Sequence, residues 1–269
     1  MTAQWLQEEK RRLLDAYDAQ LREQAEILAA ISYDRLGPLW RGKVGTQGFI
    51  TYRSLAGYSG AALDDLIART VQHYAADPHI TSVEWKTRGH DAPADLPERF
   101  MQHGFQPQEQ ETVMVGEAKL LAQDIRLPPE VAVRRIDNVT DPYPELVRAA
   151  EAQEKASGHG HGVEDLMQRL ETNPGMVEIW VAETATTVVC VGRLEVVPKS
   201  EFAGLWGGGT LPEWRGRGIY RALTAARARS AIQRGVRYLH SDCTAYSRPI
   251  LERSGLLPIT TTTPYVWNR

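Results

Sequence analysis

The chain has 269 residues, of which 42% are hydrophobic and 24% are charged, and its formal net charge is −3. This composition is typical of a globular protein with a sizeable core, and it excludes a chain-wide basic surface for nucleic acid or anionic lipid. The two cysteines, the charged amino-terminal segment and the lack of an apolar run of roughly 18 residues predict a soluble, cytoplasmic protein with reduced thiols.

The first half of the chain alternates helical and strand patterns. Apolar residues at helical spacing predict a long amphipathic helix over residues 3–31, which Gly37-Pro38 brings to an end. The same spacing is open to a coiled-coil seam, although a helix packed on a sheet is the commoner arrangement. Further along we expect a strand over 48–55, a helix over 61–75, a strand over 81–87, a short helix ending near His103 and a pair of strands out to Val115.

A connector is predicted over residues 117–130, because Pro128-Pro129 can continue neither a helix nor a central strand. After it the pattern restarts with a strand over 131–136, helices over 142–156 and 163–171, a hairpin of 177–183 with 188–197, a strand over 202–211, a helix over 218–234, a strand over 236–242, a short helix over 249–254 and a final strand over 256–267. We therefore predict two domains, 1–118 and 131–269, joined by a linker over 119–130.

The two halves echo each other. In the first half a helix is followed by HITSVEWK, a loop and ERFMQHGFQP; in the second a helix is followed by GVRYLHSD, a loop and PILERSGLLP. Gly104 and Pro107 have the same mutual spacing as Gly255 and Pro258. We interpret this as a tandem pair of related domains. Two unrelated strand–helix–strand stretches remain the alternative.

The segment GGGTLPEWRGRGIYRALTAARARSAIQRG carries the clearest chemical signal. An extended stretch is followed by Arg215-Gly216-Arg217-Gly218 and then by a strongly helix-forming run. Strand, glycine-rich turn and helix form a phosphate cradle, because the backbone N–H groups approach closely and the helix amino terminus is partly positive. The motifs G-x-G-x-x-G and G-x-x-x-x-G-K-S/T of nucleotide-binding proteins are absent, which makes a nucleotide site the weaker alternative.

Residues 215–220 resemble the pyrophosphate-loop signature of the GNAT (GCN5-related) N-acetyltransferase superfamily, which is Arg or Gln, two residues, Gly, one residue, then Gly or Ala. Arg215 and Gly218 match it, and Tyr220 departs from its small last residue. The later segment SRPILERSGLLP resembles the superfamily's late helix and turn, with Gly255-Leu256 in place of Gly-Phe. The resemblance covers residues 131–269 and implies an α/β (α+β) fold with a mixed, splayed sheet flanked by helices.

The resemblance also implies where acetyl-CoA binds. Its pantetheine arm would run along the strand before the loop, where Gly207-Gly208-Gly209 fits a β-bulge. No metal is expected. The predicted cofactor-binding residues are Gly209, Thr210, Leu211, Arg215, Gly216, Arg217, Gly218, Ile219, Tyr220 and Ser247.

The catalytic residues are less well defined by the sequence. Trp206 and Leu251 occupy positions where many relatives carry an acidic residue and a tyrosine. Tyr246 is the best substitute acid for the leaving thiolate, and a water chain could replace a protein base. Candidate bases are Glu195, His159, Glu154 and His161. The GHGHG segment of residues 158–162 suits contact with the acceptor better than metal binding, and it is also compatible with a solvated loop.

These observations predict an N-acetyltransferase that transfers an acetyl group directly to a small-molecule or peptide amine, without nucleic acid or membrane partners and compatibly with a homodimer. A non-catalytic acyl-CoA-binding or regulatory protein is the alternative. The first domain has LAGYSG near the corresponding position, without the paired arginines. We interpret it as a degenerate copy that shapes the acceptor pocket or an oligomer interface.

Overall fold

A computed structural model describes residues 3–27, 30–136, 141–158, 162–245 and 247–269. The chain divides into two compact units. The first comprises Met1–Met114, Asp242–Arg248 and Pro258–Arg269, and the second comprises Val115–Ser241 and Pro249–Leu257. Among the helices of the described ranges, none combines the length and the apolar character needed to cross a membrane.

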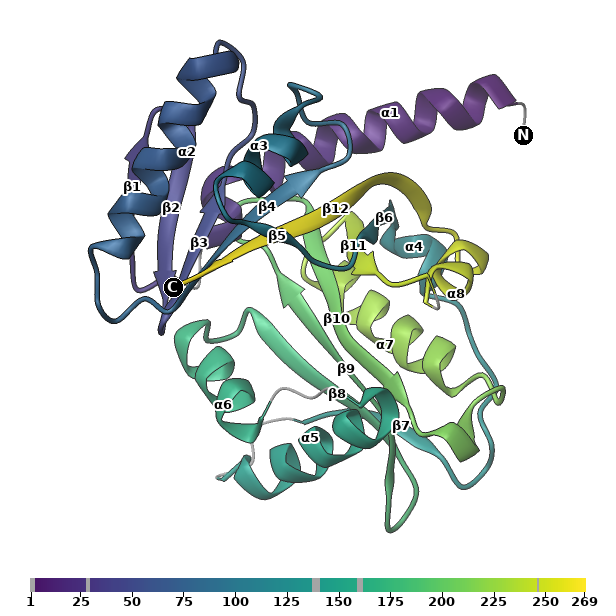
Figure 1. The fold of residues 1–269 in the computed structure, drawn as a ribbon. Helices are drawn as coiled ribbons and strands as arrows, with labels where there is room; N and C mark the ends of the chain where they lie inside the picture. The colour runs from purple at the N-terminus through teal and green to yellow at the C-terminus, as the bar shows by residue number, and fades with distance from the viewer. Residues whose placement is uncertain (1–2, 28–29, 137–140, 159–161, 246) are drawn as a thin grey trace. The chain divides into compact units, whose positions relative to one another are not determined.

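The first unit contains a strand meander followed by a helix–strand–helix segment (Figure 1). Its elements are α1 (Ala3–Gln20), the 3-10 helix η1 (Glu23–Ile27), β1 (Ser32–Leu36), β2 (Leu39–Val44), β3 (Gln47–Thr51), α2 (Gly60–Ala75), β4 (Ser82–Arg88), α3 (Leu96–Gln102) and β5 (Gln106–Pro107). The chain then passes through β6 (Glu111–Glu117) toward the second unit and returns with β12 (Leu257–Asn268).

The sheet of the first unit is mixed. β1, β2 and β3 pair antiparallel, β4 lies parallel to β3, and β12 pairs antiparallel with β4. Its core is aromatic: Trp85 of β4 is fully buried, and its ring centroid lies 4.7 Å from that of Phe100 of α3. The alternating burial of β4 follows from the period of two along a strand.

The last strand is the point at which the compact units and the predicted domains differ. Residues from Pro258 onward contact the first unit, where β12 pairs with β4 from Thr262↔Arg88 to Asn268↔Ser82. The predicted domain limits at 118 and 131 describe the repeat in the sequence and stay a prediction. A fragment cut at those limits would carry a strand whose pairing partner is missing.

The long helix predicted over residues 3–31 is wrong in its second part. α1 ends at Gln20, Glu23 adopts a left-handed φ of 61°, and η1 follows. Gly37-Pro38 does not end a helix but lies between β1 and β2, with Gly37 at φ 57°. The predicted strand over 48–55 is the third strand of this meander, β3.

A buried ionic cluster fixes η1 against β4. The Glu26 carboxylate accepts hydrogen bonds from Arg88 and from the Thr51 hydroxyl, and Lys86 Nζ lies 3.9 Å from its Oε1. Lys86 also pairs with Asp242 at 2.7 Å. Burial alone raises the pKa of Glu26, but the charges of Arg88, Lys86 and Arg22 outweigh it and the net pKa is lowered.

The second unit follows the predicted element order closely (Figure 1). Its elements are α4 (Ala118–Leu121), β7 (Ala132–Arg135), α5 (Tyr143–Ser157), α6 (Val163–Thr172), β8 (Val177–Glu183), β9 (Val188–Val196), β10 (Phe202–Thr210), the 3-10 helix η2 (Pro212–Trp214), α7 (Ile219–Gln233), β11 (Tyr238–Cys243) and α8 (Arg248–Arg253). β11 ends in the first unit, and α8 begins there.

The sheet of the second unit lies between α5 and α7. β7, β8, β9 and β10 pair antiparallel, and β11 lies parallel to β10. A Cβ added at Gly209 would meet Ala156 of α5, whereas one added at Gly208 would meet Tyr220 of α7. Because neighbouring strand residues point to opposite faces, the two helices cover opposite faces of the sheet.

Buried polar contacts hold α7 in place. Arg227 is fully buried, and its Nη1 donates to the Arg193 carbonyl at 2.9 Å. Gly192 leaves the space for it, since a Cβ there would lie 2.6 Å from Arg227 Nη1. Near the other end of the helix, Ser230 donates to the buried carboxylate of Glu178 at 2.8 Å. These contacts fix the helix whose amino terminus carries the predicted loop.

The two units share one order of elements. Three antiparallel strands, a helix and a strand parallel to the third occur as β1, β2, β3, α2 and β4, and again as β8, β9, β10, α7 and β11. The predicted mixed α/β architecture with a repeated order is therefore confirmed at the level of the fold.

Candidate functional site

Strand β10 bulges and then leaves its neighbour. Its register with β9 shifts between Trp206 and Gly209, and Gly207 has a φ of 57°. Its parallel pairing with β11 ends at Gly204↔His240, although β10 continues to Thr210. The structure therefore has the bulge expected at the three glycines and the splayed strands that the resemblance implied. Such a bulge re-aims backbone groups out of the ladder, where a ligand can reach them.

The loop after β10 presents unused backbone donors. Gly216 and Gly218 have φ values of 74° and 78°, a left-handed conformation that favours glycine. The first helical hydrogen bond of α7 runs from the Ala222 amide to the Gly218 carbonyl at 3.0 Å. Within the described chain, the amides of residues 216–221 donate no hydrogen bond. These amides, at the positive end of a 15-residue helix, form a cradle suited to a phosphate group.

The two loop arginines have different environments. Arg215 Nε donates to the Thr210 carbonyl at 3.0 Å, and its Nη2 donates to the Ala156 carbonyl at 2.7 Å, so this side chain ties the loop to β10 and α5. The guanidinium of Arg217 stacks over the Trp214 ring at 4.8 Å. Arg217 is exposed and is the more available of the two as a phosphate ligand.

Tyr220, which departs from the small residue of the GNAT signature, is accommodated by a glycine. A Cβ added at Gly208 would lie 2.7 Å from Tyr220 Cε2, so the ring occupies the space that a side chain on β10 would need. The Arg227 guanidinium lies 5.9 Å from the same ring. The larger residue therefore fits without displacing the loop.

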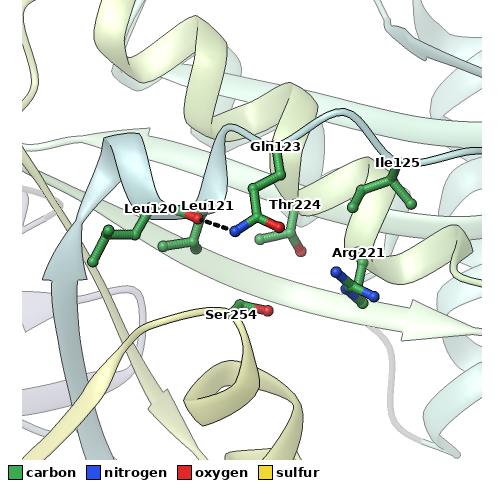
Figure 2. Close-up of a pocket in the computed structure, with 7 residues that line it drawn as sticks. All are labelled: Leu120, Leu121, Gln123, Ile125, Arg221, Thr224 and Ser254. Atoms are coloured by element: carbon green, nitrogen blue, oxygen red, sulfur yellow. Dashed lines mark hydrogen bonds between the residues drawn. The ribbon is translucent and has the colours of Figure 1, made fainter.

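A small pocket lies beside the loop (Figure 2). Its lining residues come from α4 and the connector, from α7 and from the end of α8: Leu120, Leu121, Gln123, Ile125, Arg221, Thr224 and Ser254. Figure 2 shows Gln123 Nε2 donating to the Leu120 carbonyl at 3.0 Å. Arg221 forms no ion pair or hydrogen bond within the described chain.

The pocket and the cradle are neighbours. A Cβ added at Gly218 would lie 3.5 Å from Ile125 Cγ2, and Ile125 lines the pocket. Arg221 is on the first turn of α7 and belongs to both. It is a residue that the loop signature does not contain, and its position one turn after Gly218 is the signal that could have found it.

Comparison with known proteins identifies the fold. No family model and no curated sequence matches the chain. A GCN5-related N-acetyltransferase from Kribbella flavida superposes with a TM-score of 0.70 at 14% identity, over 95% of this chain and 94% of that one. The chain has the GNAT fold. Another GCN5-related N-acetyltransferase, from Sphaerobacter thermophilus, has a TM-score of 0.61 at 18% identity over 86% and 76% of the two chains.

The tandem arrangement also has a counterpart among GNAT structures. A tandem GNAT protein from the clavulanic acid biosynthesis pathway, solved without acetyl-CoA, has a TM-score of 0.64 at 11% identity, over 86% of this chain and 78% of that one. The repeated strand–helix order of the two units agrees with such a tandem. At identities this low, the structural similarity shows the fold alone.

The remaining predicted cofactor-binding residues lie in different environments. Gly209 and Thr210 end β10 beside the bulge. Leu211 and Ile219 are buried in the core. Ser247 lies in the turn before α8, where its amide donates to the Thr244 carbonyl at 3.1 Å.

Of the catalytic candidates, Tyr246, His159 and His161 lie outside the described residues, and their roles stay predictions. Glu154 is exposed on α5. Glu195 is on β9, where its Oε1 accepts from Arg193 Nε at 3.0 Å and lies 3.7 Å from Arg169 Nη1.

One residue at the point where β10 and β11 part, His240, was not among the residues predicted from the sequence. His240 is 8% exposed on β11, at the last pair before the strands part, and its ring lies 5.3 Å from that of Trp206. The Trp206 ring packs over Gly204, where a side chain would clash with it. A histidine within the apolar strand pattern of residues 236–242 was the available signal.

Neither cysteine is exposed to solvent. Both are buried and unbridged. Burial raises the pKa of Cys190 to about 11, and its Sγ accepts from the Thr210 hydroxyl at 3.1 Å. Within the described ranges, no three His, Cys, Asp or Glu side chains are grouped as metal ligands.

Proposed function

We propose that the second unit binds acetyl-CoA and transfers its acetyl group to an amine. The observation that carries this proposal is the combination of a bulged β10, which parts from β11, with the unused amides at the amino terminus of α7. The amides of residues 216–221, Arg217 and Arg221 would bind the pyrophosphate, and β10 would hold the pantetheine arm. Two of the solved structures with this fold are named as GCN5-related N-acetyltransferases, which supports acetyl transfer.

The reaction is a direct acyl transfer. The neutral amine nitrogen attacks the thioester carbonyl, a C–N bond forms, and the C–S bond breaks as the thiolate leaves. One proton leaves the nitrogen and one reaches the sulfur, so the products are an acetamide and free CoA. Backbone amides at the 207–209 bulge would stabilise the oxyanion. A direct transfer is favoured because Cys190 is buried with a raised pKa.

We expect one acetyl-CoA to bind per chain, with CoA competing and ATP or NAD not competing. Titration calorimetry measures the stoichiometry, and release of free thiol in the presence of an amine panel measures transfer. Failure of acetyl-CoA to bind would contradict the assignment of the loop.

A non-catalytic acyl-CoA-binding protein is the second candidate. It is motivated by Trp206 and the buried Leu251, which stand where many relatives have an acidic residue and a tyrosine. Tight binding of acetyl-CoA with no thiol release across amines and peptides would favour this candidate.

A further inference from the structure

A buried arginine faces the β10 bulge. Arg193 is on β9 opposite Trp206, and the residue is 4% exposed. Its Nε is bound to Glu195, but its Nη1 has no hydrogen-bond partner in the described part of the chain. Buried polar groups are rarely left unpaired in native proteins, so this nitrogen is available to donate a hydrogen bond to an oxygen of a ligand.

A second donor converges on the same point. A Cβ added at Gly207 would lie 2.9 Å from Arg193 Nη1 and 2.9 Å from Gln153 Nε2. Gln153 is a buried residue of α5, so the pair lies on the α5 side of the bulge, whereas Tyr220 lies on the α7 side. Glycine at position 207 allows these two side chains to approach the backbone of the bulge. Two N–H donors therefore lie close together next to the bulge, where they can donate to an oxygen atom.

The charges around Arg193 favour an anionic oxygen. Glu195 is shared, because Arg169 of α6 lies 3.7 Å from it, and Arg169 in turn binds Asp165 at 2.8 Å. Burial lowers the pKa of Arg193, and this effect exceeds the opposing effect of the Glu195 charge. The guanidinium is therefore only partly compensated. A carboxylate supplies both the missing charge and an oxygen of suitable geometry.

We propose that Arg193, with Gln153 beside it, binds a carboxylate of the substrates next to the thioester. The inference rests on the proposed acetyl-transfer site, because the bulge at residues 207–209 is where the reacting carbonyl would lie. The carboxylate could belong to the acceptor, as in an α-amino acid, or to the acyl group, as in a dicarboxylic acyl-CoA. Arg193 acts as a specificity residue and takes no part in the bond changes.

The test compares matched substrates that differ only in the carboxylate. With acetyl-CoA as donor, glycine, L-phenylalanine and L-lysine are compared with their amides and with methylamine, 2-phenylethylamine and cadaverine. In the second arm, succinyl-CoA is compared with acetyl-CoA, by turnover and by calorimetry. We expect the carboxylate form to be preferred by about tenfold or more in kcat/KM or Kd in one of the arms. The arm that shows the preference identifies the source.

Variants test whether the preference for a carboxylate depends on the Arg193 side chain. Arg193→Gln should remove it, and Arg193→Lys should retain part of it, because lysine keeps the charge without the planar fork. Arg134→Gln is the control, since Arg134 of β7 is also an ion-paired strand arginine but pairs with Glu183 of β8 and Glu145 of α5. It should leave the preference unchanged. The comparison of acid, amide and amine in the unmodified protein stands even if Arg193→Gln fails to fold.

Two outcomes would be decisive against the inference. If acetyl-CoA binds but acids, amides and amines are used alike and succinyl-CoA gains nothing, Arg193 binds no carboxylate and the proposed function stands. If acetyl-CoA does not bind at all, the proposed function itself is wrong and this inference fails with it.

Discussion

Replacing Glu26 by glutamine is expected to lower the free energy of unfolding of the first unit by about 3–5 kcal/mol at neutral pH. Arg88 and Lys86 are buried around this carboxylate, and Arg22 Nε lies 4.0 Å from it. A neutral amide would leave these cations without their shared counter-charge. Denaturant unfolding measures the loss, and hydrogen exchange of η1 and β4 locates it. Glu109→Gln, at an exposed position of the same unit, is the control and should change the stability little.

The difference in free energy of unfolding between Glu26→Gln and the unmodified protein should shrink as the pH falls. The folded pKa of Glu26 is lowered, so its contribution is present above the unfolded pKa, about 4.3, and is lost as the pH falls through the folded pKa. Below that value Glu26 is neutral in both states, and the two proteins converge. A difference under about 1 kcal/mol at pH 7, or one that grows on acidification, would contradict the role given to Glu26.

The second unit could be predicted from the sequence better than the first. Gly218 and Gly235 flank α7, and most predicted ends fall within about two residues of the observed ones. In the first unit the apolar spacing of α1 continues past Gln20, although the chain turns there. The β1–β2 hairpin was missed because β1 is largely exposed and lacks an apolar face.

The site was predictable where it depends on local sequence. Glycines and a following helix revealed the loop, since backbone conformation is a local property. Arg227 lies in the helix-forming run after the loop, but it is fully buried because Gly192, 35 positions earlier, leaves room for it. The pairing of Tyr220 with Gly208 and of Arg193 with the bulge likewise depends on strand register. Such contacts join distant positions, and no local pattern contains them.

Replacing Gly216 and Gly218 together by valine is expected to weaken acetyl-CoA binding by at least about 100-fold, or about 2.7 kcal/mol. A Cβ at Gly216 has no atom within 4 Å, so the space before these amides is open to a ligand. Branched side chains there would occupy that space and keep the phosphates from the N–H groups. Calorimetry with acetyl-CoA measures the change. A double variant that binds with unchanged affinity would show that the pyrophosphate lies elsewhere.

Backbone strain is separated from blocked binding by a matched pair of glycines. Gly175 and Gly235 have φ values of 74° and 79°, nearly those of the loop glycines, and a Cβ at either has no atom within 4 Å. Their double valine variant should lose a similar amount of stability, about 1–2 kcal/mol per residue, and keep its affinity for acetyl-CoA. Loss of affinity in this control would mean that the loop variant acts through the fold.

The same substitution in the first unit tests the degenerate-copy prediction. Gly57, before α2, and Gly60, its first residue, have φ values of 90° and 52°, and a Cβ at either has no atom within 4 Å. This turn has the glycines of a cradle but lacks the paired arginines, and Arg53 lies upstream of it. Because a phosphate site benefits from fixed positive charge beside its N–H groups, Gly57→Val with Gly60→Val should leave one site per chain at full affinity. A second equivalent site, or a loss of binding that follows residues 57 and 60 rather than 216 and 218, would assign the cofactor to the first unit.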